Sequence, residues 1–133
     1  MGDLGAIVVD ALRAALPDAL AIYLYGSRAR GDALPSSDVD VAVLPSRPLD
    51  PVRRFELAQE IAARVGHDVD LVDLLTATAA LRVQIIDDGV VLYDGAPTRR
   101  EAFETRALGE YARLFEERRE ILQDVAARGR IRG

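Results

Sequence analysis

Two short apolar segments, joined by a linker too short for a full crossover helix, constrain the fold most. Residues 19–25 read Ala-Leu-Ala-Ile-Tyr-Leu-Tyr, and residues 38–44 read Asp-Val-Asp-Val-Ala-Val-Leu. Both patterns are typical of strands. The linker contains Gly31, Asp32 and Pro35, which predict a loop with room for one helical turn at most. Because parallel neighbours need a longer crossover, the sheet is predicted to be mixed rather than purely parallel.

Helical and strand patterns alternate along the remaining chain. Helices are predicted over residues 4–16, 51–65 and 76–88 and from a Thr98/Glu101 capping box onward, and strands over 68–74 and 90–93. The apolar stripe of the helix over 51–65 is expected to comprise Val52, Phe55, Ala58, Ile61, Ala62 and Val65. The pattern predicts one α/β (α+β) domain spanning residues 1–133, with helices packed on a mixed sheet and a long C-terminal helix.

Composition excludes several classes of function. The chain has no cysteine, which excludes a disulfide framework, a thiolate zinc site and a cysteine nucleophile. Its net charge of −5 argues against broad nucleic-acid binding. All 17 basic residues are arginine, so a guanidinium must make any basic phosphate contact. Without a basic leader or a long apolar run, we expect neither a signal peptide nor a membrane span, and a cytoplasmic location.

Asp38 and Asp40 are the first candidate site residues. Side chains two apart in a strand point to the same face, so the two carboxylates are expected to stand side by side. Aspartate is depleted in strands, and like charges on one face repel. A divalent cation would offset that cost; the alternative is a solvent-facing strand with an accidental pair of aspartates.

Gly26 and Ser27 follow the first predicted strand directly. Glycine allows close approach of backbone to a phosphate, and the N–H groups of the turn can donate to phosphate oxygens. The Ser27 hydroxyl adds a donor. A phosphate site beside a carboxylate pair is the arrangement that a metal–nucleoside triphosphate complex requires.

Gly26-Ser27, ten residues and Asp38-Val-Asp40 together resemble the Gly-Ser-x10-Asp-x-Asp motif of the DNA polymerase β-like nucleotidyltransferases. The fuller string around it is similar to the minimal nucleotidyltransferases, and most similar to the antitoxins of HEPN/MNT toxin–antitoxin modules. The resemblance covers roughly residues 18–95. It implies a nucleotidyltransferase fold and a third carboxylate on a later strand. We assign that carboxylate to Asp70, although Asp68 shares its face; Asp68 and Asp73 are expected to be solvated strand ends.

The resemblance further implies two-metal Mg²⁺ chemistry with ATP as substrate. Asp38 and Asp40 would bind the metals that carry the triphosphate, and Asp70 would complete the metal site by helping to hold the metal near the attacking hydroxyl, whose proton it would accept. Gly26 and Ser27 would hold the terminal phosphates, while Arg28 and Arg30 are phosphate contacts or structural residues. The expected reaction moves AMP onto a hydroxyl of a partner protein, a HEPN-type toxin, without direct nucleic-acid or membrane contact. Two alternatives stay open: transfer to a small molecule such as an aminoglycoside, and an antitoxin that binds without chemistry.

Overall fold

The computed structural model describes the backbone of residues 3–132 and the side chains of residues 4–128. The helices are α1 (Asp3–Ala15), α2 (Ser27–Arg30), α3 (Pro51–Val65), α4 (Ala79–Asp88) and α5 (Pro97–Arg132). The strands are β1 (Ala21–Tyr25), β2 (Val39–Leu44), β3 (Val69–Asp73) and β4 (Val90–Asp94). The single helical turn expected after the first strand is the short helix α2.

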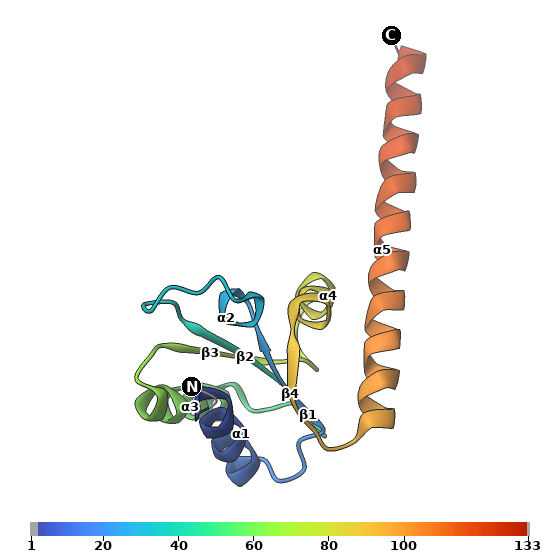
Figure 1. Ribbon diagram of the computed structural model, residues 1–133. Helices are drawn as coiled ribbons and strands as arrows, with labels where there is room; N and C mark the ends of the chain where they lie inside the picture. The colour runs from blue at the N-terminus through green and yellow to red at the C-terminus, as the bar shows by residue number, and fades with distance from the viewer. Residues whose placement is uncertain (1–2, 133) are drawn as a thin grey trace.

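The four strands form one mixed sheet in the order β3-β2-β1-β4. β1 runs antiparallel to both β2 and β4, and β2 runs parallel to β3. The parallel pair is the one joined through a full helix, α3, as crossover connections require. The predicted mixed sheet with helices packed on it and a long C-terminal helix is therefore confirmed (Figure 1).

Different helices cover the two faces of the sheet. On one face, α1 and α3 pack against β2 through buried residues such as Leu12, Ile61 and Val41. On the other, Ile85 of α4 and Phe103 of α5 pack around Tyr23 of β1. The sheet therefore has no broad apolar face left open within the described part of the chain, and polar side chains gather at one end of its strands.

Helix ends follow the local sequence signals with two exceptions. Asp50 caps α3 by accepting a hydrogen bond from the Arg53 N–H, and Gly66 ends that helix in the left-handed region at φ 73°. The predicted Thr98/Glu101 capping box is wrong, because α5 already begins at Pro97 and the carbonyl of Ala96 accepts from the Arg100 N–H. α4 begins at Ala79, three residues later than predicted, behind a Thr78 cap.

The predicted buried stripe of α3 is only partly correct. Ala58 and Ile61 are buried, but Val52 and Phe55 are 65% and 64% exposed. Val52 precedes Ile61 by nine residues, which is about half a turn around a helix of ~3.6 residues per turn. Leu57 is buried instead, since it lies on the side of α3 that faces α1 and the sheet.

α5 (36 residues) extends well beyond the sheet and the helices packed on it (Figure 1). The sheet with α1 to α4 is called the body below. Its first turns pack on α4, where Arg82 forms an ion pair with Glu110 at 3.4 Å. Every described residue from Tyr111 onward is exposed, so the second half of this helix projects away from the sheet. Among the described helices, none is both long enough and apolar enough to cross a membrane.

Candidate active site

Asp40 and Asp70 are direct neighbours across the parallel strand pair. The register of β2 and β3 sets Asp40 opposite Asp70, and the register of β1 and β2 sets Tyr25 opposite Asp40. Asp38 lies just before β2 and is exposed. Since Tyr25 belongs to the apolar cluster under α4, these carboxylates lie on the α4 side of the sheet.

Gly26 brings the backbone of the turn after β1 against the Asp40 carboxylate. Its φ of 72° lies in the left-handed region that favours glycine. A Cβ built on Gly26 would collide with Asp40 Oδ2 and lie 3.1 Å from Asp40 Cγ. Glycine is therefore required at position 26 both for its backbone conformation and because the Asp40 carboxylate leaves no space for a Cβ.

The charges of the cluster act on one another. Burial, followed by the negative charges of Asp70 and Asp38, raises the pKa of Asp40, while the charge of Arg30 opposes that rise. Burial and the charges of Asp70 and Asp40 likewise raise the pKa of the Tyr25 hydroxyl. The protein therefore concentrates negative charge at this end of the sheet at an electrostatic cost, as expected of a site that binds cations.

Asp73 is a structural residue, so its predicted role as a solvated strand end is wrong. Its side chain is 3% exposed. Asp73 Oδ2 accepts from the Leu49 N–H at 2.8 Å, and Oδ1 accepts from the Leu75 N–H at 2.9 Å. The carboxylate thus fastens the loop before α3 and the turn after β3, and it is not available to the candidate site.

Asp68 lies outside β3, at the outer end of the site. Its carbonyl accepts from the Val39 N–H at 2.8 Å, which continues the parallel pairing of β2 and β3. Asp68 and Asp38 line a shallow hollow together with His67. The register therefore sets Asp70, rather than Asp68, beside Asp40.

The donor chemistry of the cluster fits Mg²⁺, which prefers carboxylate oxygens. Within the described side chains, no group of three or more His, Asp or Glu residues lies close enough to hold a metal ion. Mg²⁺ is usually held by one or two carboxylates together with substrate phosphates and water, and not by a cage made of protein alone. The Asp40–Asp70 pair with Asp38 beside it supplies such a partial ligand set.

The short helix α2 starts at the site. Among the residues that the structure describes, no side-chain hydrogen bond caps its first turn, which leaves N–H groups there for an anion. Ser27 is half-buried at this helix start. Arg30 Nη1 forms an exposed ion pair with Asp88 Oδ2 of α4 at 3.3 Å, and so connects α2 to α4.

Arg28 holds the loop that leads to Asp38. Its Nη2 donates to the Ser37 carbonyl at 2.6 Å and lies 3.4 Å from His67 Nδ1. His67, the only histidine of the chain, is half-buried in this contact. No sequence signal points to the Arg28–His67 contact, because it joins residues 39 apart.

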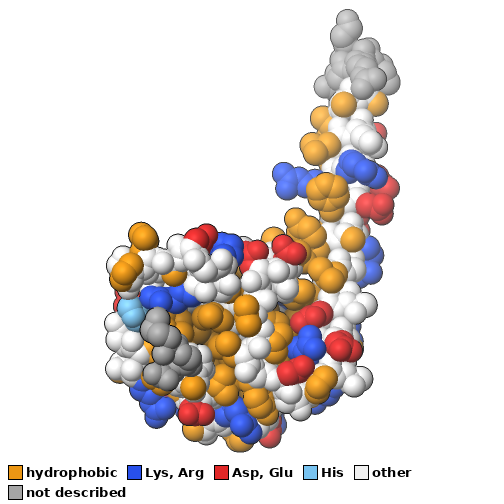
Figure 2. All heavy atoms as spheres, viewed as in Figure 1, with side chains coloured by type: hydrophobic (Ala, Val, Ile, Leu, Met, Phe, Trp, Pro, Cys, Tyr) orange, Lys and Arg blue, Asp and Glu red, His pale blue; other side chains and the backbone are white. Residues whose placement is uncertain are grey.

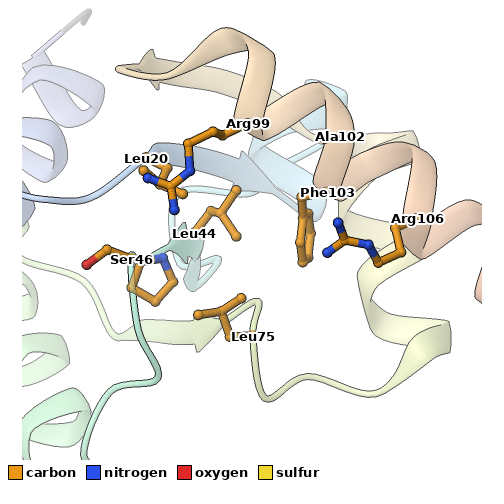
Figure 3. A pocket seen from close by; sticks show the side chains of 9 residues that line it. Leu20, Leu44, Ser46, Leu75, Arg99, Ala102, Phe103 and Arg106 are labelled. Carbon is orange, nitrogen blue, oxygen red and sulfur yellow. The ribbon is translucent and has the colours of Figure 1, made fainter.

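A second hollow lies at the opposite end of the strands. Figure 3 shows its lining side chains, which include Leu20, Leu44, Arg99, Phe103 and Arg106. Leu20 precedes β1 and Leu44 ends β2, whereas the carboxylate cluster lies where β1 ends and β2 begins. This hollow is therefore separate from the candidate active site.

Comparison with known proteins identifies the family of this chain. The family described as "Polymerase beta, Nucleotidyltransferase" matches residues 10–98. The protein adenylyltransferase MntA of Shewanella oneidensis is 38% identical over 120 residues, which cover 90% of this chain and 86% of MntA.

Two solved structures share the fold over nearly their whole length. A toxin–antitoxin crystal structure with AMP-PNP is 36% identical at a TM-score of 0.83, covering 91% of this chain and 97% of that one. The MNT antitoxin in complex with a tri-AMPylated Shewanella oneidensis HEPN toxin is 34% identical at a TM-score of 0.79, covering 94% and 98%. This chain therefore belongs to the polymerase beta nucleotidyltransferase family.

Proposed function

We propose that this protein is an adenylyltransferase that moves AMP from ATP onto a hydroxyl of a HEPN-type toxin and so acts as its antitoxin. The observation that carries the proposal is the register pair Asp40–Asp70, with Gly26 pressed against Asp40. This contact sets the carboxylate cluster next to the turn proposed to bind phosphate, where β1 ends and β2 begins. The named activity of MntA and the tri-AMPylated toxin in a related complex support this choice of reaction and acceptor.

Each site residue has a part in the proposed reaction. Asp38 and Asp40 would hold the Mg²⁺ that carries the triphosphate, and Gly26, Ser27 and the first N–H groups of α2 would hold the terminal phosphates. Bound Mg²⁺ would supply charge neutralisation for the attacking and leaving oxygens. Arg28 positions the loop that carries Asp38, through Ser37, and Arg30 positions α2 through Asp88.

Asp70 serves the acceptor. The acceptor oxygen forms a bond to the α-phosphorus of ATP, the bond from that phosphorus to the pyrophosphate breaks, and the hydroxyl proton passes to Asp70. Asp70 is exposed and lies on β3, whereas Asp40 lies on β2 and Asp38 just before β2. A protein hydroxyl can therefore approach it from solvent while the triphosphate stays on the Mg²⁺ that the other two carboxylates would hold.

A pair of labelled nucleotides tests the reaction. A HEPN-type toxin protein is incubated with this chain, Mg²⁺ and ATP labelled at either the α- or the γ-phosphate. Adenylyl transfer labels the partner from α-labelled ATP only. Label from γ-labelled ATP would show phosphoryl transfer instead, and no label from either would favour an antitoxin that binds without chemistry.

A further inference from the structure

The projecting half of α5 carries an apolar stripe that nothing in the described chain covers. We define the α5 stripe as Tyr111, Leu114, Phe115, Leu122 and Val125. Their side chains are between 39% and 60% exposed. In Figure 2 the hydrophobic side chains follow this helix mainly on its side toward the body. Large apolar side chains gathered on one side of an uncovered helix indicate a protein-binding surface.

The spacing of the stripe fits a helical partner. Tyr111, Phe115 and Leu122 follow one another at intervals of four and seven residues. That spacing keeps apolar side chains on one seam of a helix, where another helix can pack against them. Because the body does not support this half of α5, a packed partner would also stabilise the helix itself.

The charged residues beside the stripe indicate which charges the partner's surface carries. Arg118 and Arg119 line a hollow with Tyr111, Phe115 and Leu122. Within the described side chains, neither guanidinium lies within ion-pair distance of a carboxylate. The stripe therefore presents two cations next to its apolar centre.

The acidic residues of this half of α5 lie opposite the stripe or at its edges. Glu120 and Asp124 are each two residues from Leu122, whereas Glu116 directly follows Phe115 and Glu117 is three residues after Leu114. Two residues correspond to about 200° around the helix, so Glu120 and Asp124 lie on the opposite side, and Glu116 and Glu117 lie at the edges of the stripe. A complementary partner consequently has an apolar helical face with Asp or Glu facing Arg118 and Arg119.

The same charges disfavour a second copy of this chain as occupant. Arg118 stands at the midpoint of the stripe from Tyr111 to Val125. Parallel pairing of two copies, or antiparallel pairing centred on the stripe, would set Arg118 against Arg118. Like charges at a packed seam are destabilising, so the stripe is better matched to a different chain.

The stripe lies on the same side of the molecule as the candidate active site. Asp40 and Asp70 lie on the sheet face that α4 and the start of α5 cover. α4 ends at Asp88 beside Arg30, and α5 passes α4 at Arg82 before it projects (Figure 1). The projecting half of α5 thus extends past the end of the sheet where the carboxylates are.

We propose that the α5 stripe, with Arg118 and Arg119, is the surface on which the acceptor protein docks through an acidic, apolar helical face. Docking there holds the acceptor beside the Asp40–Asp70 pair, so that its hydroxyl can reach the α-phosphate. The inference rests on the proposed function for the identity of the partner as the acceptor. It adds that recognition takes place on α5, away from the reacting groups.

The test separates docking from chemistry. Binding of a HEPN-type toxin protein is measured by calorimetry without nucleotide, and its modification by intact mass with ATP and Mg²⁺. The variants are Phe115→Asp and the double variant Arg118→Glu/Arg119→Glu. The matched controls on the opposite side of the helix are Ala127→Asp and Glu120→Arg/Asp124→Arg. Melting with and without ATP–Mg²⁺ checks that the fold and the nucleotide site are intact.

We expect both stripe variants to weaken partner binding roughly tenfold or more, as for a hot-spot residue, while the controls bind like wild type. All four are expected to keep the wild-type response to ATP–Mg²⁺. Wild-type partner binding by both stripe variants would overturn the docking proposal, even if the partner is adenylylated. Self-association of this chain that Phe115→Asp abolishes would also overturn it. Loss of binding in the stripe variants, with no adenylylation by wild type, would support docking and count against the proposed function.

Discussion

The α-carbon of Gly26 faces the carboxylate of Asp40 so closely that no side chain fits between them. The turn that would hold phosphate is therefore packed directly on the carboxylate that would hold the metal. The ten-residue spacing between the Gly-Ser and Asp-x-Asp elements thus corresponds to a contact in the folded protein.

Replacing Gly26 by alanine is expected to impair catalysis more than stability. Alanine at φ 72° costs about 1–2 kcal/mol of backbone strain, and its methyl group must displace the Asp40 carboxylate. Misplacement of a catalytic group by about 1 Å lowers turnover about a hundredfold. Gly31→Ala is the matched control, since φ there is 80° with nothing within 4 Å of the added Cβ. Equal loss of activity in both variants, measured at matched stability, would contradict a specific contact with Asp40.

Asp40→Asn is expected to raise the melting temperature of the protein without nucleotide at neutral pH. The folded protein raises the pKa of Asp40, so the native state holds its proton to higher pH than the unfolded chain. Asp40 therefore contributes a loss of stability as pH rises through the interval between the unfolded and folded pKa values. Asparagine carries no charge and removes that loss.

Melting curves of wild type and Asp40→Asn from acid to neutral pH show whether the substitution stabilises or destabilises the fold. The difference between the two should be small in acid, where Asp40 is protonated in both states, and should favour the variant at neutral pH. A variant that is less stable at neutral pH would contradict mutual repulsion among these carboxylates. Addition of ATP–Mg²⁺ should reverse the order, because the variant has lost a metal ligand.

Asp70→Asn is expected to lose AMP transfer activity, whereas Asp68→Asn is expected to keep it. Asp70 lies opposite Asp40 in the strand register, whereas Asp68 lies before β3. Loss of a group that accepts the proton of the attacking hydroxyl lowers turnover by ~10²–10⁴-fold. Asp70→Asn should therefore lose transfer while keeping the thermal shift with ATP–Mg²⁺, and Asp68→Asn should keep both. Equal activity of the two variants in a single-turnover assay would remove Asp70 from its assigned role.

Asp73→Asn is expected to destabilise the fold. Each Asp73 oxygen accepts a backbone N–H, and the amide group of asparagine would face one of those donors. An unsatisfied buried group costs about 1–3 kcal/mol, which lowers the denaturation midpoint in urea. Below the melting temperature, transfer activity per folded molecule should stay near wild type. A variant with unchanged stability would contradict the fastening role of this carboxylate.

Much of the fold can be predicted from the sequence, because the signals that end helices and limit strand connections are local. Pro17, Gly66 and Gly89 each lie just beyond a helix that their neighbours form, and the short linker before Asp38 excludes a purely parallel sheet. The pairing of Asp40 with Asp70, by contrast, cannot be predicted from local signals. Strand periodicity places each on a face, but the register that makes them neighbours depends on how α3 returns the chain to the sheet.

Other features depend on contacts that no local pattern contains. The burial of Asp73 follows from a backbone N–H at Leu49, 24 residues earlier. Phe55 fits a helical apolar pattern, yet it is exposed because α1 and the sheet lie on the other side of α3. The apolar pattern of the last helix is visible in the sequence, but its lack of cover is not.

The intact mass of the HEPN-type partner tests the central claim most directly. The partner is incubated with ATP and Mg²⁺ and either wild type or the triple variant Asp38→Asn/Asp40→Asn/Asp70→Asn, and its toxicity is measured in parallel. The account predicts one or more added AMP units with wild type and none with the triple variant, and neutralised toxicity only where the mass has changed. An unchanged partner mass, with toxicity suppressed equally by wild type and the triple variant, would contradict it.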